Sequence, residues 1–402
     1  MNNDLDRRVL LGAAGLAGVA ALAASGRAGP INPPGGPVAG TGKTTDELWT
    51  KIARSDVGMA EARIPISAAT TPGDAGHQFI LSQPGSYYLT ENITGASGRA
   101  CIGIAVEGVT IDLNGYALLG ANGALAAIKL TAGSGSEITI RNGQLRGWVA
   151  ADTVALNLVP GVQLLDLIVS DCGRIALGPS AVVERCSVLD GRTTGLSVSS
   201  LSVVRASVFK ECEGNGLSIA SGVVESCAFL DNLGAGMTAS SRAVVRGCVA
   251  SGNAATGILV ALGSSVYDCA VVSCDVGISL AAAGAVDRCT VTNCTTTGIS
   301  AAGNCLVTRC MVQQNAGAGV LVTGGDTRVE SCHAADNGTG FDGPPSGAIF
   351  IANTASGNAT NYAVPAGNFG LFVSATAMAG AVNGSSGGTP LGTTDPRANL
   401  SY

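Results

Sequence analysis

The segment Val182-Val183-Glu184-Arg185-Cys186-Ser187-Val188 begins a pattern that returns every 20 to 22 residues over the second half of the chain. In each copy, hydrophobic residues precede two polar or small residues and then a small residue at the place of Cys186. The equivalent positions downstream are Ser207, Cys227, Cys248, Cys269, Cys289, Cys310, Cys332 and Asn353. Self-similarity at a fixed period of this length is the signature of a solenoid, in which each repeat forms one coil.

Two further positions in the repeat recur with the same period. A glycine followed by a hydrophobic residue stands at Gly195, Gly216, Gly236, Gly257, Gly277, Gly298, Gly319 and Gly340. Five residues after the first position, Cys, Gly or Asn recurs at Cys172, Gly191, Cys212, Asn232, Asn253, Cys274, Cys294, Asn315, Asn337 and Asn358. We expect the asparagines to adopt the left-handed conformation of a turn and to hydrogen-bond to one another along the stack.

Each repeat contains short β-type runs such as Gly-Leu-Ser-Val and lacks a helical hydrophobic period. The sequence therefore predicts an all-β fold, a single-stranded right-handed parallel β-helix of about 12 coils of about 21 residues, with coils stacked about 4.8 Å apart. The composition agrees, because 58 of 402 residues are glycine while only 4% are aromatic and 12% charged. Such a core consists of stacked small side chains.

The N-terminal part of the chain differs from the repeats. In residues 1–25, Arg7-Arg8 is followed by a hydrophobic stretch that is shorter than a typical membrane-spanning helix. This pattern predicts a twin-arginine-like export signal or an ordinary secretory signal. Residues 26–62 are expected to form a linker and a short capping helix at 44–54, because Thr44 and Glu47 make a capping box. The β-helix then occupies residues 63–402, outside the cytoplasm.

Several segments resemble one known superfamily. Together with the repeats, Val109-Thr110-Ile111-Asp112-Leu113-Asn114-Gly115 and Gln83-Pro84-Gly85-Ser86-Tyr87-Tyr88-Leu89 resemble right-handed parallel β-helix proteins of the pectate-lyase-like superfamily. The ending Thr394-Asp395-Pro396-Arg397-Ala398-Asn399-Leu400-Ser401-Tyr402 is similar to that of a group of exported, uncharacterised bacterial members. The resemblance implies the fold, whereas the fold itself hosts lyases, hydrolases, epimerases, adhesins and tailspikes.

Acidic residues occupy one position of four consecutive coils, one residue before the Cys/Gly/Asn position. They are Asp171, Asp190, Glu211 and Asp231, and the row continues with Gly252, Ser273, Asn293, Gln314 and Asp336. Arg174, Arg192 and Lys210 flank the acids. Carboxylates about 5 Å apart repel one another unless they are splayed into solvent, protonated or neutralised by a cation.

The resemblance implies a way for these residues to act on a uronate polysaccharide. Ca²⁺ on Asp171, Asp190, Glu211 and Asp231 would screen the substrate carboxylate, and Lys210, Arg192 or Arg174 would remove the adjacent proton. Alternatively, two of the acids could be the catalytic acid and base of a glycosidase. A third interpretation is a solvent-exposed turn whose acids have no catalytic role. The paired aspartates and His-Gly motif of polygalacturonases are missing from the sequence.

The remaining recurrent positions favour structure over chemistry. Among the 13 cysteines, the row from Cys186 to Cys332 is expected to be a buried stack of free thiols and not a set of disulfides, because in-register parallel neighbours point the same way and do not favour a disulfide torsion. The row Glu184, Arg205, Glu225 and Arg246 alternates in sign and predicts a salt-bridge ladder. Small or hydrophobic residues form an apolar row at Ser187, Val208, Ala228, Val249, Ala270, Thr290, Met311 and His333, a candidate surface for a homo-oligomer such as a trimer.

The sequence thus supports two hypotheses for function. The first is an exported β-helix that is structural or binds carbohydrate at the cell surface. The alternative is a polysaccharide lyase or glycoside hydrolase that acts on an acidic polysaccharide. The net charge of −6, without a basic cluster, argues against nucleic acid as a partner.

Overall fold

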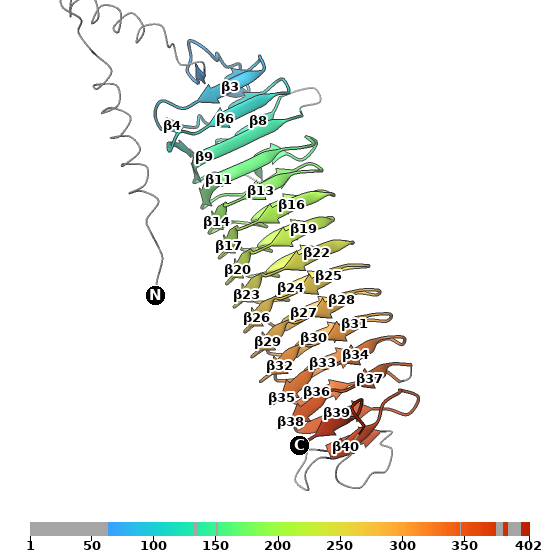
Figure 1. The fold of residues 1–402 in the computed structure, drawn as a ribbon. Coiled ribbons are helices and arrows are strands. Elements are labelled where there is room, and N and C mark those ends of the chain that lie inside the picture. The colour runs from blue at the N-terminus through green and yellow to red at the C-terminus, as the bar shows by residue number, and fades with distance from the viewer. Residues whose placement is uncertain (1–62, 132–135, 150–151, 346, 375–380, 385–394) are drawn as a thin grey trace, which may run out of the picture. The chain divides into compact units, whose positions relative to one another are not determined.

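The computed structural model describes residues 63–402 except 132–135, 150–151, 346, 375–380 and 385–394 (Figure 1). The export signal and the linker with its capping helix, expected in residues 1–62, lie outside these residues. The described chain forms a right-handed parallel β-helix whose strands belong to two parallel sheets, sheet A with 27 strands and sheet B with 15. Within this part of the chain every regular element is a β-strand, and no helix is long and hydrophobic enough to cross a membrane.

A regular coil contributes two strands to sheet A and one to sheet B. The first strands of sheet A are β1 (Ile64–Pro65), β3 (Gly85–Tyr88), β6 (Val109–Asp112), β13 (Val182–Glu184), β16 (Ser202–Arg205), β19 (Gly222–Glu225), β22 (Ala243–Arg246), β25 (Ser265–Tyr267), β28 (Ala285–Asp287), β31 (Leu306–Thr308), β34 (Arg328–Glu330) and β37 (Ile349–Ile351). The second strands are β4 (Ile93–Thr94), β7 (Ala117–Leu119), β14 (Ser187–Leu189), β17 (Val208–Lys210), β20 (Ala228–Leu230), β23 (Val249–Ser251), β26 (Ala270–Val272), β29 (Thr290–Thr292), β32 (Met311–Gln313), β35 (His333–Ala335) and β38 (Thr354–Ser356).

In two coils the first and second strands are continuous, as β9 (Ile138–Arg146) and β11 (Gln163–Ser170), and sheet A ends with β40 (Phe372–Ser374) and β42 (Asn399–Ser401). Sheet B comprises β2 (His77–Leu81), β5 (Ala100–Ile104), β8 (Ala126–Leu130), β10 (Asp152–Leu156), β12 (Arg174–Leu177), β15 (Leu196–Val198), β18 (Leu217–Ile219), β21 (Met237–Ala239), β24 (Ile258–Val260), β27 (Val276–Leu280), β30 (Thr297–Ala301), β33 (Ala318–Val322), β36 (Thr339–Asp342), β39 (Thr360–Val364) and β41 (Ala381–Gly384).

The coil count exceeds the expected number. Fifteen strands in sheet B make fourteen steps between coils, so the helix has about 14 turns and not about 12. The additional turns lie at the ends of the solenoid, where coils are irregular in length and do not carry the Cys186-type residue. A count based on that residue misses them, because the hydrogen-bonded register of the backbone defines a coil even where its sequence departs from the repeat.

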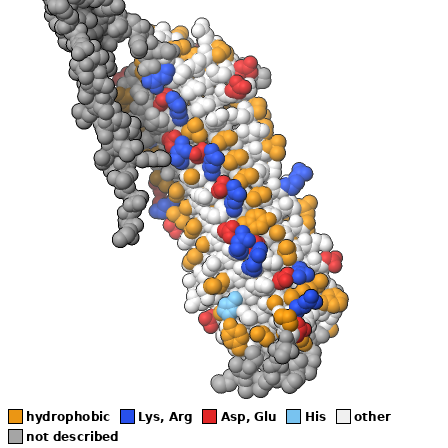
Figure 2. Space-filling model, viewed as in Figure 1, with side chains coloured by type: hydrophobic (Ala, Val, Ile, Leu, Met, Phe, Trp, Pro, Cys, Tyr) orange, Lys and Arg blue, Asp and Glu red, His pale blue; other side chains and the backbone are white. Residues whose placement is uncertain are grey.

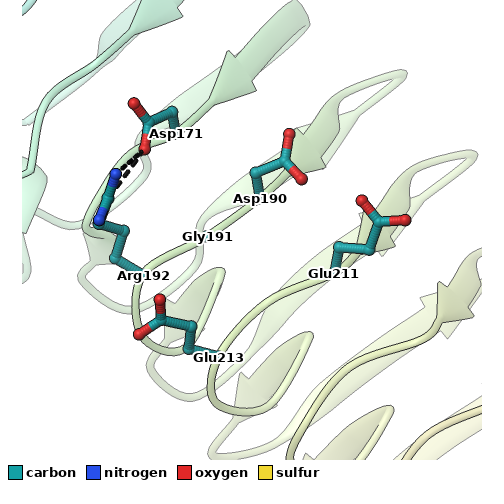
Figure 3. Close-up of a pocket in the computed structure, with 6 residues that line it drawn as sticks. All are labelled: Asp171, Asp190, Gly191, Arg192, Glu211 and Glu213. Carbon is teal, nitrogen blue, oxygen red and sulfur yellow. Dashed lines mark hydrogen bonds and ion pairs between the residues drawn. The ribbon is translucent and has the colours of Figure 1, made fainter.

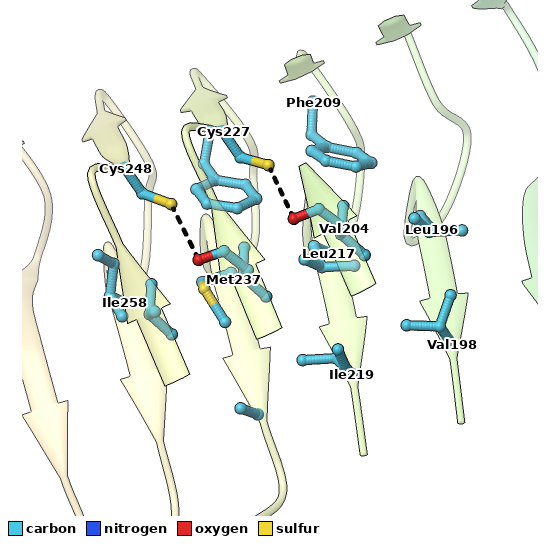
Figure 4. Packing of buried hydrophobic residues seen from close by; sticks show 14 of the residues in the cluster. Leu196, Val198, Val204, Phe209, Leu217, Ile219, Cys227, Met237, Cys248 and Ile258 are labelled. Atoms are coloured by element: carbon cyan, nitrogen blue, oxygen red, sulfur yellow. Dashed lines mark hydrogen bonds between the residues drawn. The ribbon is translucent and has the colours of Figure 1, made fainter. Parts of the chain in front are cut away.

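The core consists of like residues stacked on equivalent strands. Leu196, Leu217, Met237 and Ile258 follow one another on β15, β18, β21 and β24, and all are fully buried (Figure 4). The Phe209 and Phe229 rings stack in the same way, with centroids 5.6 Å apart. Burial of one such side chain contributes about 1.5–3 kcal/mol, so the repeated stacks supply most of the stability of the fold.

The recurrent glycines permit close approach between coils. A Cβ atom on Gly236 would lie 2.5 Å from the carbonyl oxygen of Gly257 in the next coil, which is inside van der Waals contact. The same clash recurs at other glycines of this row, for example between Gly277 and Gly298. The row is therefore required by packing between backbones.

The expected buried thiols are confirmed, since all 13 cysteines are buried and free. They also act as polar groups. The thiol of Cys227 donates to the carbonyl oxygen of Glu225 at 3.3 Å, and the Sγ atom of Cys269 accepts the backbone N–H of Cys248 at 3.4 Å. Ser207 accepts the N–H of Cys186 in the same way at 3.1 Å. Cys186 and its equivalents in the other coils, which we call the cysteine column, thus form a ladder of hydrogen bonds as well as part of the core.

Candidate functional site

The row of acids lies at a corner of the β-helix where the backbone is left-handed. We call the turns between the second strand of sheet A and the strand of sheet B the polar corner; its surface row is Asp171, Asp190, Glu211, Asp231, Gly252, Ser273, Asn293, Gln314 and Asp336. Every residue of this row has a positive φ, between 51° and 68°. Asp, Asn and Gly tolerate this conformation best, which explains much of the composition of the row without any chemistry.

The asparagine prediction is therefore wrong in one part and confirmed in the other. The left-handed residue is the one before the asparagine, because the asparagine side chain turns into the core. There Asn315 accepts the N–H of Cys294 at 2.9 Å and donates to Oδ1 of Asn337 at 2.8 Å. Asn337 donates in turn to Asn358 at 3.0 Å. This buried ladder of asparagine amides holds the turns of the polar corner in place from the core side.

The upstream part of the polar corner contains a shallow depression of about 250 Å³. Its lining residues are Asp171, Asp190, Gly191, Arg192, Glu211 and Glu213 (Figure 3). Arg192 reaches back to the preceding coil, where its Nη2 atom lies 2.6 Å from Oδ1 of Asp171. Both side chains are about half exposed, so this ion pair is worth little in stability but holds the guanidinium in place.

Lys210, Asp190 and Glu211 form a coupled group beside this depression. Nζ of Lys210 lies 2.8 Å from Oε1 of Glu211, and this contact lowers the pKa of Glu211 and raises that of Lys210. The pKa of Asp190 is raised, chiefly by a hydrogen bond with Glu211. The carboxylate of Glu211 thus disfavours the charged form of Asp190, as expected of neighbouring acids.

Of the other predicted site residues, Arg174 lies apart from this group, whereas Asp231 follows Glu211 on the next coil. Arg174 begins β12 and donates to Oδ1 of Asp152 at 2.9 Å. Oδ1 of Asp231 occupies the space that a Cβ on Gly252 would need, 2.2 Å from that position. In the part of the chain that the structure describes, no group of three or more His, Cys, Asp or Glu side chains is arranged to hold a metal ion. The calcium and catalytic roles remain predictions.

The downstream part of the same corner is also hollowed. A second, more open depression of about 590 Å³ is lined by Asn293, Thr295, Gln314, Ala316, Asp336 and Gly338, with the tops of the amide and thiol ladder between them. It carries amide and hydroxyl groups with a single acid. The polar corner therefore changes along its length from a charged to a largely neutral hydrogen-bonding surface.

The predicted charge ladder and apolar row occupy sheet A. Arg205 pairs with Glu184 at 2.5 Å and Arg246 with Glu225 at 3.0 Å, as expected. Figure 2 shows basic and acidic side chains in contact along one face of the coils. In the apolar row Val249 and Met311 are exposed, at 42% and 45%, and the ring of Tyr402 stacks on His333 at one end.

A polar group near the start of sheet B was not anticipated. Nδ1 of His77 lies 3.0 Å from Oδ1 of Asp74, and a depression of about 360 Å³ nearby is lined in part by Lys129, Thr131 and Asn157. The local sequence gave one signal, the spacing of Asp74 and His77 in a turn. Thr131, more than 50 residues later, lies with the His77 ring over Gly103, and this depends on the coil register, which the repeat does not reveal.

The parallel register of successive coils makes the described part of the chain a parallel β-helix. The sequence profile described as "Right handed beta helix region" matches residues 220–296 and 276–377. Among curated proteins, no sequence matches the chain. The match to the β-helix profile agrees with the hydrogen-bonded register of the strands.

Solved structures similar to this chain include two epimerase modules and a viral receptor binding domain. The A-module of mannuronan C-5 epimerase AlgE4 from Azotobacter vinelandii is 18% identical, with 68% of this chain and 87% of that chain covered and a TM-score of 0.46. The AlgE6 A-module from the same organism is 14% identical, with 79% and 89% covered and a TM-score of 0.40. The tailspike receptor binding domain of Siphovirus 9NA is 8% identical, with 84% and 78% covered and a TM-score of 0.42.

Proposed function

We propose that this chain is an exported β-helix protein that binds an extended polysaccharide along its polar corner without cleaving it. The observation that carries the proposal is the repetition of a surface polar side chain at the same place in successive coils, with two depressions on that one line. Export rests on the sequence of residues 1–25 and is part of the proposal.

The chemistry of the corner suits sugar hydroxyl groups. Carboxylates accept hydrogen bonds from hydroxyls, while the amides of Asn293 and Gln314 both donate and accept. Successive coils present these groups about 4.8 Å apart, so an extended chain of sugars meets a regular series of partners. The buried ladder of Asn315 and Asn337 holds the turns in one conformation, which reduces the entropy lost on binding.

The electrostatics of the acidic part favour binding over proton abstraction. A lysine base works best with a lowered pKa, whereas the carboxylate of Glu211 raises the pKa of Lys210. Arg192 is held by Asp171.

The test compares two amide variants with a neighbour of the same type. The double variant N293A/Q314A removes two hydrogen-bonding groups from the downstream depression, and Q313A removes the same kind of group from the last residue of β32, outside that depression. We expect the double variant to bind a neutral polysaccharide about tenfold more weakly in affinity electrophoresis, and Q313A to bind like the wild type. Equal binding by all three proteins would exclude the corner as the binding surface.

A second measurement separates binding from cleavage. The protein is incubated with a panel of acidic polysaccharides, with and without Ca²⁺, and unsaturated uronates are followed by absorbance. We expect no release. Calcium-dependent release that is lost in K210Q would contradict the proposal and would favour the lyase alternative, with Asp171, Asp190, Glu211 and Asp231 as the calcium site.

A further inference from the structure

Asp74, in the turn before β2, and His77, the first residue of β2, are held in a single arrangement by hydrogen bonds. Oδ1 of Asp74 accepts the backbone N–H groups of Gly76 and His77 at 2.8 and 2.7 Å, as well as facing Nδ1 of the His77 ring at 3.0 Å. The hydrogen bond from His77 is the main cause of a lowered pKa for Asp74. The carboxylate therefore fixes both the turn and the orientation of the imidazole.

The ring of His77 lies over Gly103 on β5. A Cβ atom on Gly103 would be 2.7 Å from Cδ2 of His77 and 2.5 Å from Cγ2 of Thr131, so no larger residue fits beneath them. Gly103 is the register partner of Lys129 on β8. The imidazole and the Thr131 side chain thus meet over a glycine that lies next to the lysine in the sheet.

The depression beside Thr131 combines an unpaired cation with hydrophobic surface. Lys129 is exposed, and among the described residues no acidic side chain pairs with it. Asn157 provides an amide on the neighbouring coil, and Leu158 lies at the rim with 79% of its surface exposed. An apolar side chain beside a few polar groups suits a ligand with one charged and one apolar side.

We propose that this depression binds an anionic group attached to an apolar or sugar ring, with Lys129 contacting the anion, Asn157 hydrogen-bonding to it and Leu158 packing against the ring. The anion is a carboxylate or sulfate, carried either by a glycan or by a small organic acid. His77 borders the site and positions the Thr131 side. The site is separate from the polar corner, so the proposal does not depend on the function assigned to that surface.

The test uses matched ligands and a matched cation. Binding of dextran sulfate, unsulfated dextran and cyclohexanecarboxylate to the full chain is measured by titration calorimetry for wild type, K129Q, N157D and R242Q. K129Q removes one positive charge from the depression, and R242Q removes one from the turn between β21 and β22, which lines neither this depression nor the polar corner. Circular dichroism confirms that each variant is folded, which we expect because Lys129, Asn157 and Arg242 are exposed.

We expect at least one of the two anionic ligands to bind more tightly than dextran. For that ligand, K129Q and N157D should lower the affinity by about tenfold or more, while R242Q should leave it unchanged, because a charged hydrogen bond is worth about a factor of ten to a hundred. Binding of dextran sulfate alone identifies a glycan source, and binding of the carboxylate identifies a small acid. No binding of either ligand, or equal losses in K129Q and R242Q, would overturn the proposal.

Discussion

At the residue scale, one backbone torsion accounts for much of what the acidic row first suggested. Glu211 and its equivalents in the other coils have positive φ, and this conformation costs a typical side chain about 1–2 kcal/mol while glycine adopts it freely. Gly252 occupies the same position in one coil of the row, and Asp or Asn in several others. Recurrent acids at a corner are thus partly a consequence of turn geometry, and their charges must be judged separately.

This explanation predicts opposite effects for glycine at two adjacent residues. Gln314 has φ 58° and is exposed, whereas Gln313 lies in β32. We expect Q314G to raise the free energy of unfolding by about 0.5–1 kcal/mol and Q313G to lower it by a similar amount. Urea denaturation followed by circular dichroism measures both. A loss of stability in Q314G equal to that in Q313G would show that backbone conformation does not govern this row.

At the scale of one structural element, the cysteine column shows that a buried thiol can satisfy the hydrogen-bonding groups of a turn. Cys269 donates its S–H to the carbonyl oxygen of Tyr267 at 3.1 Å and accepts a backbone N–H from the preceding coil. Ser207 and Asn353 occupy the same column and make equivalent hydrogen bonds. The feature that these residues share is a small side chain that both donates and accepts.

Replacement of cysteine by serine should therefore be tolerated inside the column and costly outside it. We expect C269S to change the free energy of unfolding by less than about 1 kcal/mol, because the hydroxyl inherits both hydrogen bonds. Cys101 lies elsewhere in the core, where burial raises the pKa of its thiol to about 12. C101S should cost about 1–3 kcal/mol, since it buries a more polar group. Thermal or urea unfolding checks both, and equal costs would refute the ladder.

At the scale of the whole β-helix, the ends and the long faces differ in how they are protected. Tyr362 closes the C-terminal end, where its hydroxyl donates to the carbonyl oxygens of Asn353 and Leu400 at 3.0 and 3.1 Å and its ring stacks on Phe341. The apolar row on sheet A has no comparable cover over Val249 or Met311 among the described residues. A stack of coils needs such terminal closure to avoid pairing end to end.

We propose that the apolar row is the contact between copies in a homo-oligomer, with a trimer as the expected state. Sedimentation equilibrium should give a mass that is a multiple of the chain's own. V249E/M311E should be monomeric because it places two charges in the buried contact, whereas L259E, on the outward face of sheet B, should keep the wild-type mass. A monomeric wild type at high concentration would exclude this role.

Much of the fold was predictable because each coil of a solenoid has the same strands, turns and buried positions, and the sequence pattern repeats with them. The recurrence at Cys186 and Gly195 gave the coil period, and the alternation of Glu184 and Arg205 gave a ladder that the structure confirms. The acidic row was also placed on one corner. Its internal pairing was not predictable, because whether Arg192 contacts Asp171 or Asp190 depends on side-chain reach between coils and not on the period.

The sequence by itself determined the class of fold, the buried free thiols and the residues that share each corner, since all of these follow from periodicity and small side chains. Only the tertiary structure decided the number of coils, the identity of the left-handed residue, the raised pKa of Asp190 and the position of the His77 ring and Thr131 over Gly103. Each of these depends on contacts between segments at unequal sequence separation, for which a repeat of about 21 residues carries no information.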